Sequence, residues 1–71
     1  MDVNKLKGKI VEKGLNVETL ARKIGIDRST LYRKLNKQGD TLTVREVNII
    51  CKELGLSKDE AMDIFFRNVV A

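Results

Sequence analysis

Apolar residues recur every three or four positions along five segments of this chain. The stripes are Val3-Leu6-Ile10, Val17-Leu20-Ile24, Leu31-Leu35, Val44-Val47-Ile50-Leu54 and Ala61-Phe65-Val69. This spacing is that of one face of an α-helix, and no segment alternates with the period of two that marks a half-buried strand. The pattern predicts an all-α fold with helices over residues 2–13, 17–24, 28–36, 44–54 and 58–69.

Glycine and capping residues mark the ends of these segments. Gly25 and Gly55 each precede an apolar residue, as the left-handed end of a helix requires. Candidate N-caps follow at Asn16, Asp27, Thr43 and Ser57. Thr43 and Ser57 each have a glutamate three residues later, which is the capping-box spacing.

Residues 17–35 form the most informative stretch, because two predicted helices are joined there by a very short turn. Gly25 allows a left-handed backbone in the turn, and Ala21 is small enough to lie where the helices touch. These features predict a helix-turn-helix unit. At 71 residues the chain has room for one domain, which we place over residues 1–71.

The composition excludes several classes of function. The chain has no histidine, one cysteine and no nucleophile–base pair, so we expect neither an enzyme nor a metal or cofactor site. Cys51 lies among apolar neighbours and is expected to be packed. The longest apolar run, Ile49–Cys51, is too short to cross a membrane. With no apolar leader after Met1, a cytoplasmic location is expected.

Positive charge is concentrated in the middle of the chain. The formal net charge is +4 overall, yet residues 22–37 alone carry +5, whereas residues 38–71 are mildly acidic. A short basic segment in a small domain indicates a polyanionic partner, with nucleic acid first and an anionic membrane second. A solvated helix face is the alternative interpretation.

The helix-turn-helix stretch resembles a known family. Its residues read Leu20-Ala21-x-x-Ile24-Gly25-Ile26-x-x-Ser29-Thr30-Leu31-Tyr32-Arg33. This pattern is similar to the lambda-repressor-like (XRE) domain of phage repressors and Cro proteins. The resemblance implies a compact five-helix domain that binds double-stranded DNA and regulates transcription, in a phage or prophage context. The second helix of the unit would then enter the major groove.

The resemblance also assigns roles to individual positions. The residues expected to read bases are Arg28, Ser29, Arg33 and Tyr32, with packing on a neighbouring helix as the alternative for Tyr32. The residues expected to contact phosphates are Asn16, Thr30, Asn36, Lys37, Gln38 and Arg45. The amides that open the second helix are expected to assist Asn16.

Two positions depart from the family pattern. Val17 stands where many members carry a glutamine that fixes a backbone contact. Lys34 stands where the family usually has an apolar residue, and Leu35 is expected to fill that place in the core.

The C-terminal segment offers an apolar surface. Phe65 and Phe66 project about 100° apart on a helix, so one of them can fill the core while the other stays outside. We expect Met62, Ile64, Phe66, Val69 and Val70 to contact a partner. The resemblance implies a homodimer. The alternative is a small modulator or antirepressor that keeps the fold and binds a repressor protein.

Overall fold

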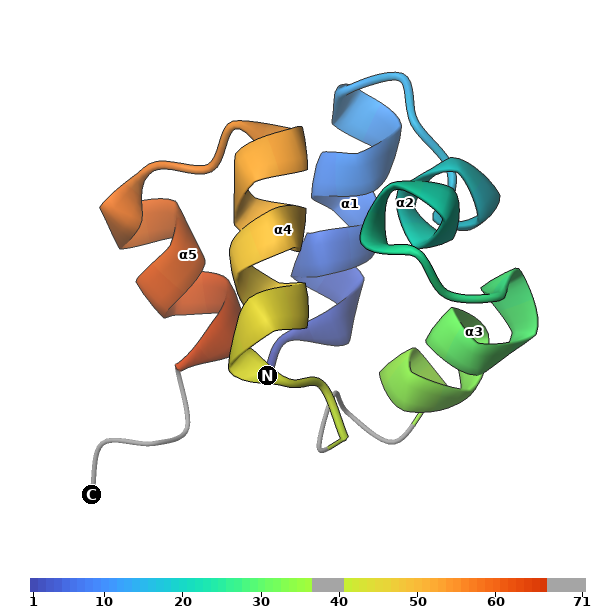
Figure 1. Ribbon diagram of the computed structural model, residues 1–71. Coiled ribbons are helices and arrows are strands. Elements are labelled where there is room, and N and C mark those ends of the chain that lie inside the picture. Colours follow the sequence, from blue (N-terminus) through green and yellow to red (C-terminus); the bar gives the residue numbers. More distant parts are fainter. Residues whose placement is uncertain (37–40, 67–71) are drawn as a thin grey trace.

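The computed structural model describes residues 1–36 and 41–66, and within these ranges the chain forms five helices and no strand (Figure 1). They are α1 (Val3–Glu12), α2 (Val17–Ile24), α3 (Arg28–Asn36), α4 (Val44–Leu54) and α5 (Lys58–Phe65). The all-α prediction is therefore confirmed. None of these helices is both long and apolar enough to cross a bilayer.

The predicted boundaries hold closely for α1 to α4, but α5 is shorter than the predicted 58–69. It ends at Phe65, and Phe66 is its C-cap, with φ −121° and ψ 15° outside the helical region. The apolar stripe predicted to continue the helix includes Val69, which lies outside the described residues. Periodicity alone does not mark the end of a helix that lacks a glycine stop.

The helix ends follow the capping chemistry predicted from the sequence. Thr43 Oγ1 accepts from Glu46 N at 3.1 Å, and Glu46 Oε1 accepts from Thr43 N at 2.9 Å, which completes a capping box. Ser57 and Glu60 form the same pair of bonds at 3.1 and 3.0 Å. Gly25 ends α2 in the left-handed region at φ 90°.

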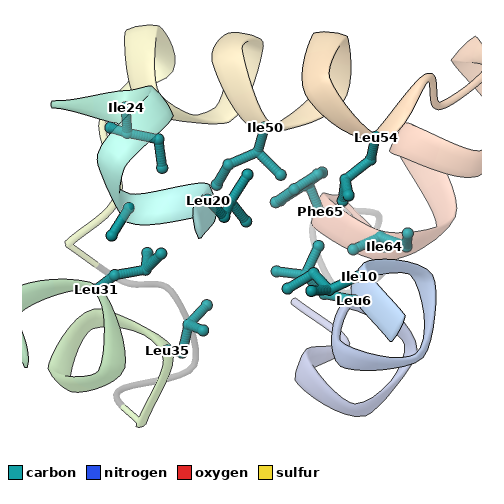
Figure 2. Close-up of a cluster of buried hydrophobic side chains, with 11 residues drawn as sticks. Leu6, Ile10, Leu20, Ile24, Leu31, Leu35, Ile50, Leu54, Ile64 and Phe65 are labelled. Carbon is teal, nitrogen blue, oxygen red and sulfur yellow. The ribbon is translucent and has the colours of Figure 1, made fainter. Parts of the chain in front are cut away.

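The core lies where all five helices converge (Figure 2). α2 packs against both α3 and α4, and α1 packs against α5. The buried apolar residues are Leu6, Ile10, Leu20, Ala21, Ile24, Leu31, Leu35, Ile50, Leu54, Ile64 and Phe65. Leu35 is buried, which agrees with the expectation that it fills the place in the core that the family pattern assigns to the position of Lys34. The helix-turn-helix unit is thus held on the rest of the domain through α2.

One member of the predicted stripes is exposed among the residues that the structure describes. Val44 is 78% exposed, whereas Glu46, two residues later, is 6% exposed. Val44 is the first residue of α4, and the side chain that turns inward in this first turn belongs to the capping-box glutamate. The glutamate of a capping box can therefore be buried in the first turn of a helix, where the apolar pattern had predicted Val44 to be buried.

Polar contacts join α1 to α5, and they were not predictable from the sequence pattern. Asp2 N donates to the carbonyl of Ile64 at 2.7 Å. Lys9 Nζ lies 2.5 Å from Glu60 Oε2, and Lys5 pairs with Asp63. These contacts join the two ends of the described chain across one side of the molecule.

Candidate nucleic-acid interface

The exposed face of α3 carries the four residues predicted to read bases. Leu31 and Leu35 turn into the core, so the opposite side of the helix faces solvent. Positions i, i+1, i+4 and i+5 share a helix face, and we call this set the α3 outer face: Arg28, Ser29, Tyr32 and Arg33, all exposed. The structure therefore leaves these four side chains exposed on one surface of the helix-turn-helix unit.

The start of α3 is held by its own cap and by the turn from α2. Asp27 Oδ2 accepts from Ser29 N at 3.1 Å, and the Asp27 carbonyl accepts from Leu31 N at 3.1 Å. In the turn, Ile26 N donates to the carbonyl of Ala21 at 3.0 Å. These bonds fix the direction in which α3 leaves the turn, and so where Arg28 and Ser29 point.

An acidic side chain lies beside the α3 outer face. Glu18 on α2 is 3.4 Å from Arg28 Nη1 and 3.8 Å from Arg22 Nη2. The Glu18–Arg22 pair has the ordinary i,i+4 spacing and is visible in the sequence. The Glu18–Arg28 contact exists only because the turn folds α3 back toward α2, so the summed charge of the segment did not predict it.

Thr30 and Arg33 are linked within α3. Arg33 Nη2 donates to Thr30 Oγ1 at 3.4 Å. Thr30 is half-buried, whereas Arg33 is exposed. The hydroxyl predicted to contact phosphate therefore lies next to a guanidinium predicted to read a base.

Asn16 acts first as a helix cap. Its Oδ1 accepts from Thr19 N at 2.8 Å, so that amide is not available to a phosphate. The side-chain NH₂ group is the donor that Asn16 retains. Tyr32 borders a shallow surface depression with Asn16 and Val17. This position puts the tyrosine at the junction of α3 with the start of α2, while about half of its surface stays exposed.

The remaining phosphate positions lie near the two ends of the segment between α3 and α4. Asn36 is the exposed last residue of α3, and Arg45 is exposed in the first turn of α4. Lys37 and Gln38 lie outside the described residues.

Lys34 does not face solvent as an ordinary surface lysine. Its Nζ donates to both carboxylate oxygens of Glu46, at 2.8 and 3.0 Å. The Lys34 ammonium and the Thr43 amide hold the pKa of the Glu46 carboxyl below its ordinary value, against the opposing effect of burial. This pair was not predictable from the sequence pattern, because its members are twelve residues apart and lie on different helices.

Within the described residues, two of the residues predicted to form the apolar surface of the C-terminal segment are exposed. Met62 is 48% and Phe66 42% exposed, and we call these two residues the α5 patch. The expectation for Ile64 was wrong, because its side chain is completely buried in the core and is not accessible to a partner. Val69 and Val70 lie outside the described residues.

Other chemistry is sparse within the part of the chain that the structure describes. No cluster of three or more potential metal ligands occurs there. Cys51 is half-buried against the core, and burial raises the pKa of its thiol. That position agrees with the packing role expected for it.

Comparison with known proteins addresses the family. The family model of the Cro/C1-type helix-turn-helix DNA-binding domain matches residues 5–66, which include all of α2 to α5 and most of α1. No match was found among curated proteins or among solved structures. The chain belongs to the Cro/C1-type helix-turn-helix DNA-binding domain family, which supports a role as a DNA-binding transcriptional regulator.

Proposed function

We propose that this protein is a sequence-specific transcriptional regulator of phage or prophage type that inserts α3 into the major groove of double-stranded DNA. The observation that carries the proposal is the α3 outer face. Arg28 and Arg33 are exposed on a helix whose opposite side is anchored in the core. An arginine can donate two parallel hydrogen bonds to guanine O6 and N7, which is the commonest specific contact in the major groove.

Ser29 and Tyr32 complete the base-reading set. Ser29 lies between the two arginines on the same face, and its hydroxyl can donate to or accept from a base edge. Tyr32 flanks that face, where its ring reaches a thymine methyl group or its hydroxyl reaches a phosphate. Discrimination among sequences then comes from these four side chains.

Contacts with the DNA backbone fix how α3 enters the groove. The proposed donors come from three places: the start of α2 (Asn16), α3 and the segment after it (Thr30, Asn36, Lys37, Gln38), and the start of α4 (Arg45). Because these donors belong to three different parts of the chain, we expect the contacts to include phosphates on both sides of the groove. Arg45 is the best test, because it is exposed and forms no ion pair within the described residues.

We further propose that the α5 patch forms a homodimer contact, so that two copies read two half-sites about 34–36 Å apart. Exposed Met62 and Phe66 support this, and Val69 and Val70 belong to the same proposed contact. A Phe66→Glu variant should sediment as a monomer at a concentration where the unmodified protein is a dimer. If the unmodified protein sediments as a monomer at tens of micromolar, that result would contradict this contact.

The deciding experiment is selection of binding sites from random duplex DNA at about 150 mM salt. An enriched palindrome, bound ~10³-fold or more above unrelated duplex, is expected. Arg33→Ala should lose about 1–3 kcal/mol of binding free energy on the selected site and relax specificity at one position. Arg45→Ala should weaken all duplexes similarly and reduce the salt slope by about one. Lys52→Ala, an exposed position on α4, serves as the control for a lost charge.

Salt-sensitive binding with no enriched sequence would contradict the proposal and leave only a basic patch. The α5 patch then favours the second candidate, a modulator or antirepressor that binds a repressor protein. The double variant Arg28→Ala/Arg33→Ala separates the two functions. If regulation survives that change, reading of the groove is not the function.

A further inference from the structure

The Lys34–Glu46 pair joins three parts of the fold at one ammonium group. Lys34 lies in the last turns of α3, and its Nζ contacts both carboxylate oxygens of Glu46 at 2.8 and 3.0 Å. The same Nζ donates to the carbonyl of Thr41 at 3.2 Å, just before α4 begins. Glu46 is 6% exposed and also accepts from Thr43 N at 2.9 Å.

This pair is the polar link between α3 and α4. Both helices pack extensively on α2, and within the described residues the side-chain hydrogen bonds that run directly from α3 to α4 are those of Lys34. Apolar packing on α2 is not directional, whereas an ammonium held by three oxygen acceptors has a defined geometry. The ion pair therefore defines the position of α3 relative to the start of α4.

The neighbours of the pair give this position a functional meaning. Arg33 precedes Lys34 on α3, and Arg45 precedes Glu46 on α4; both arginines are exposed. Because Arg33 and Arg45 are each one residue away from a member of the pair, a fixed Lys34–Glu46 contact sets the separation of the backbone positions from which the two arginines extend.

We propose that Lys34 and Glu46 are positioning residues for DNA recognition, which hold base-reading Arg33 at a set distance from phosphate-contacting Arg45. This inference rests on the proposed function. Functional side chains need support within about 0.5 Å of their productive geometry, which a second layer of packed and hydrogen-bonded groups supplies. A looser α3 still meets phosphates but no longer aligns Arg33 with a base edge.

The rival role for Lys34 is direct contact with a phosphate, as the basic segment would suggest. The ammonium has three N–H donors, and three oxygen atoms are already within hydrogen-bond distance of it. A phosphate would have to displace one of these partners, two of which belong to a buried carboxylate. The geometry therefore favours positioning.

The double variant Lys34→Met/Glu46→Gln tests the pair. Methionine keeps the length of the lysine stem, and glutamine retains the capping box because its carbonyl still accepts from Thr43 N. Breaking only one partner would leave a buried charge uncompensated, so the double change is the cleaner one. Lys52→Met/Glu53→Gln is the matched control, with the same chemical changes on α4 and no side-chain hydrogen bond within the described residues.

The readouts are affinity for the selected duplex, affinity for a scrambled duplex, and the salt slope, at a temperature where circular dichroism shows every variant folded. We expect about a tenfold loss on the selected duplex, comparable with the discrimination of one bidentate arginine–guanine pair. Scrambled-duplex affinity and the salt slope should stay unchanged. Equal losses on both duplexes with a slope reduced by about one would overturn positioning in favour of a phosphate contact.

A measurement without DNA separates this inference from the proposed function. Amide hydrogen exchange in the last turn of α3 should become at least several-fold faster in the double variant, while α1 and α5 stay as protected as in the control. Unchanged exchange in α3 would overturn the positioning role. Absence of any selected sequence, with faster exchange in α3, would overturn the proposed function while leaving the structural link intact.

Discussion

At the scale of single residues, the charge that DNA meets differs from the charge that the sequence contains. Arg28 and Arg22 share one acidic neighbour, Glu18, and Lys34 is bound to Glu46. Arg33 forms no ion pair within the described residues, and its side chain donates there to the hydroxyl of Thr30. Of the two arginines proposed to read bases, Arg33 is therefore the better placed.

Neutralising Glu18 should strengthen DNA binding. In Glu18→Gln, Arg28 loses an exposed partner whose attraction is worth about 0.2–1 kcal/mol, and the approaching phosphates no longer meet a like charge. We expect affinity for any duplex to rise about 2- to 5-fold, measured by fluorescence anisotropy at low salt. Glu53→Gln is the control, because it removes one acidic charge from α4 instead of α2. Unchanged or weaker binding would exclude Arg28 from the interface.

At the scale of elements, the helix ends are determined by local chemistry. Capping boxes begin α4 and α5, and glycines in the left-handed region follow α2 and α4. Since α2 and α3 are joined by only three residues, the conformation at Gly25 determines how α3 is presented. α5 lacks such a glycine, which is why its end was not predictable from the pattern.

Two glycines offer a matched test of this interpretation. Gly25 has φ +90°, where an L side chain is strained although the space around it is open. Gly8 lies within α1 and also has open space around it. Gly25→Ala should destabilise the fold by about 1–3 kcal/mol, whereas Gly8→Ala should stabilise it by up to about 1 kcal/mol. Urea unfolding with a common m-value measures both; equal effects would contradict the strain argument.

At the scale of the whole molecule, the ion pairs between α1 and α5 make closure of the domain depend on pH. A hydrogen bond from Lys9, with further bonds from Ser57, lowers the pKa of the Glu60 carboxyl from 4.5 to about 2. The same contact raises the pKa of Lys9. Because the folded pKa of Glu60 lies below its ordinary value, its contribution to stability is complete above pH 4.5 and is lost as the pH falls toward 2.

Glu60→Gln should flatten this acid dependence. Glutamine can still form the capping box, but it carries no charge and therefore cannot form the ion pair with Lys9. We expect the variant to melt below the unmodified protein at pH 7 and to approach it at pH 2, with melting temperatures followed by circular dichroism. Glu53→Gln is the control, and its melting temperature should change between pH 7 and pH 2 by as much as that of the unmodified protein. A Glu60→Gln profile parallel to that of the unmodified protein would contradict the α1–α5 contact.

A core substitution tests how the domain supports α3. Leu31 is completely buried and belongs to α3 itself. Leu31→Ala should lower the free energy of unfolding by about 2–5 kcal/mol, which is a large share of the stability of so small a domain. Urea unfolding measures this loss, and Tyr32→Ala is the matched exposed neighbour. Similar losses at both positions would mean that α3 is not anchored as described.

Much of the fold was predictable because its signals are local. The apolar period, the capping residues and Gly25 each act within one or two helical turns, and they correctly placed α1 to α4. The α3 outer face was predictable for the same reason, since Leu31 and Leu35 define which side of the helix is buried. Ile64 was misassigned because its partners in the core lie on another helix, far away in the sequence.

By itself, the sequence determined the helices, their caps, the short turn and the side of α3 that faces outward, because these depend on neighbours a few residues apart. Only the tertiary structure decided which charges are paired between different helices. Glu18 reaches Arg28, Lys34 reaches Glu46 and Lys9 reaches Glu60 across separate helices. Electrostatic interactions follow distance in space rather than in sequence, so the electrostatics of the proposed interface became visible only after the helices were packed.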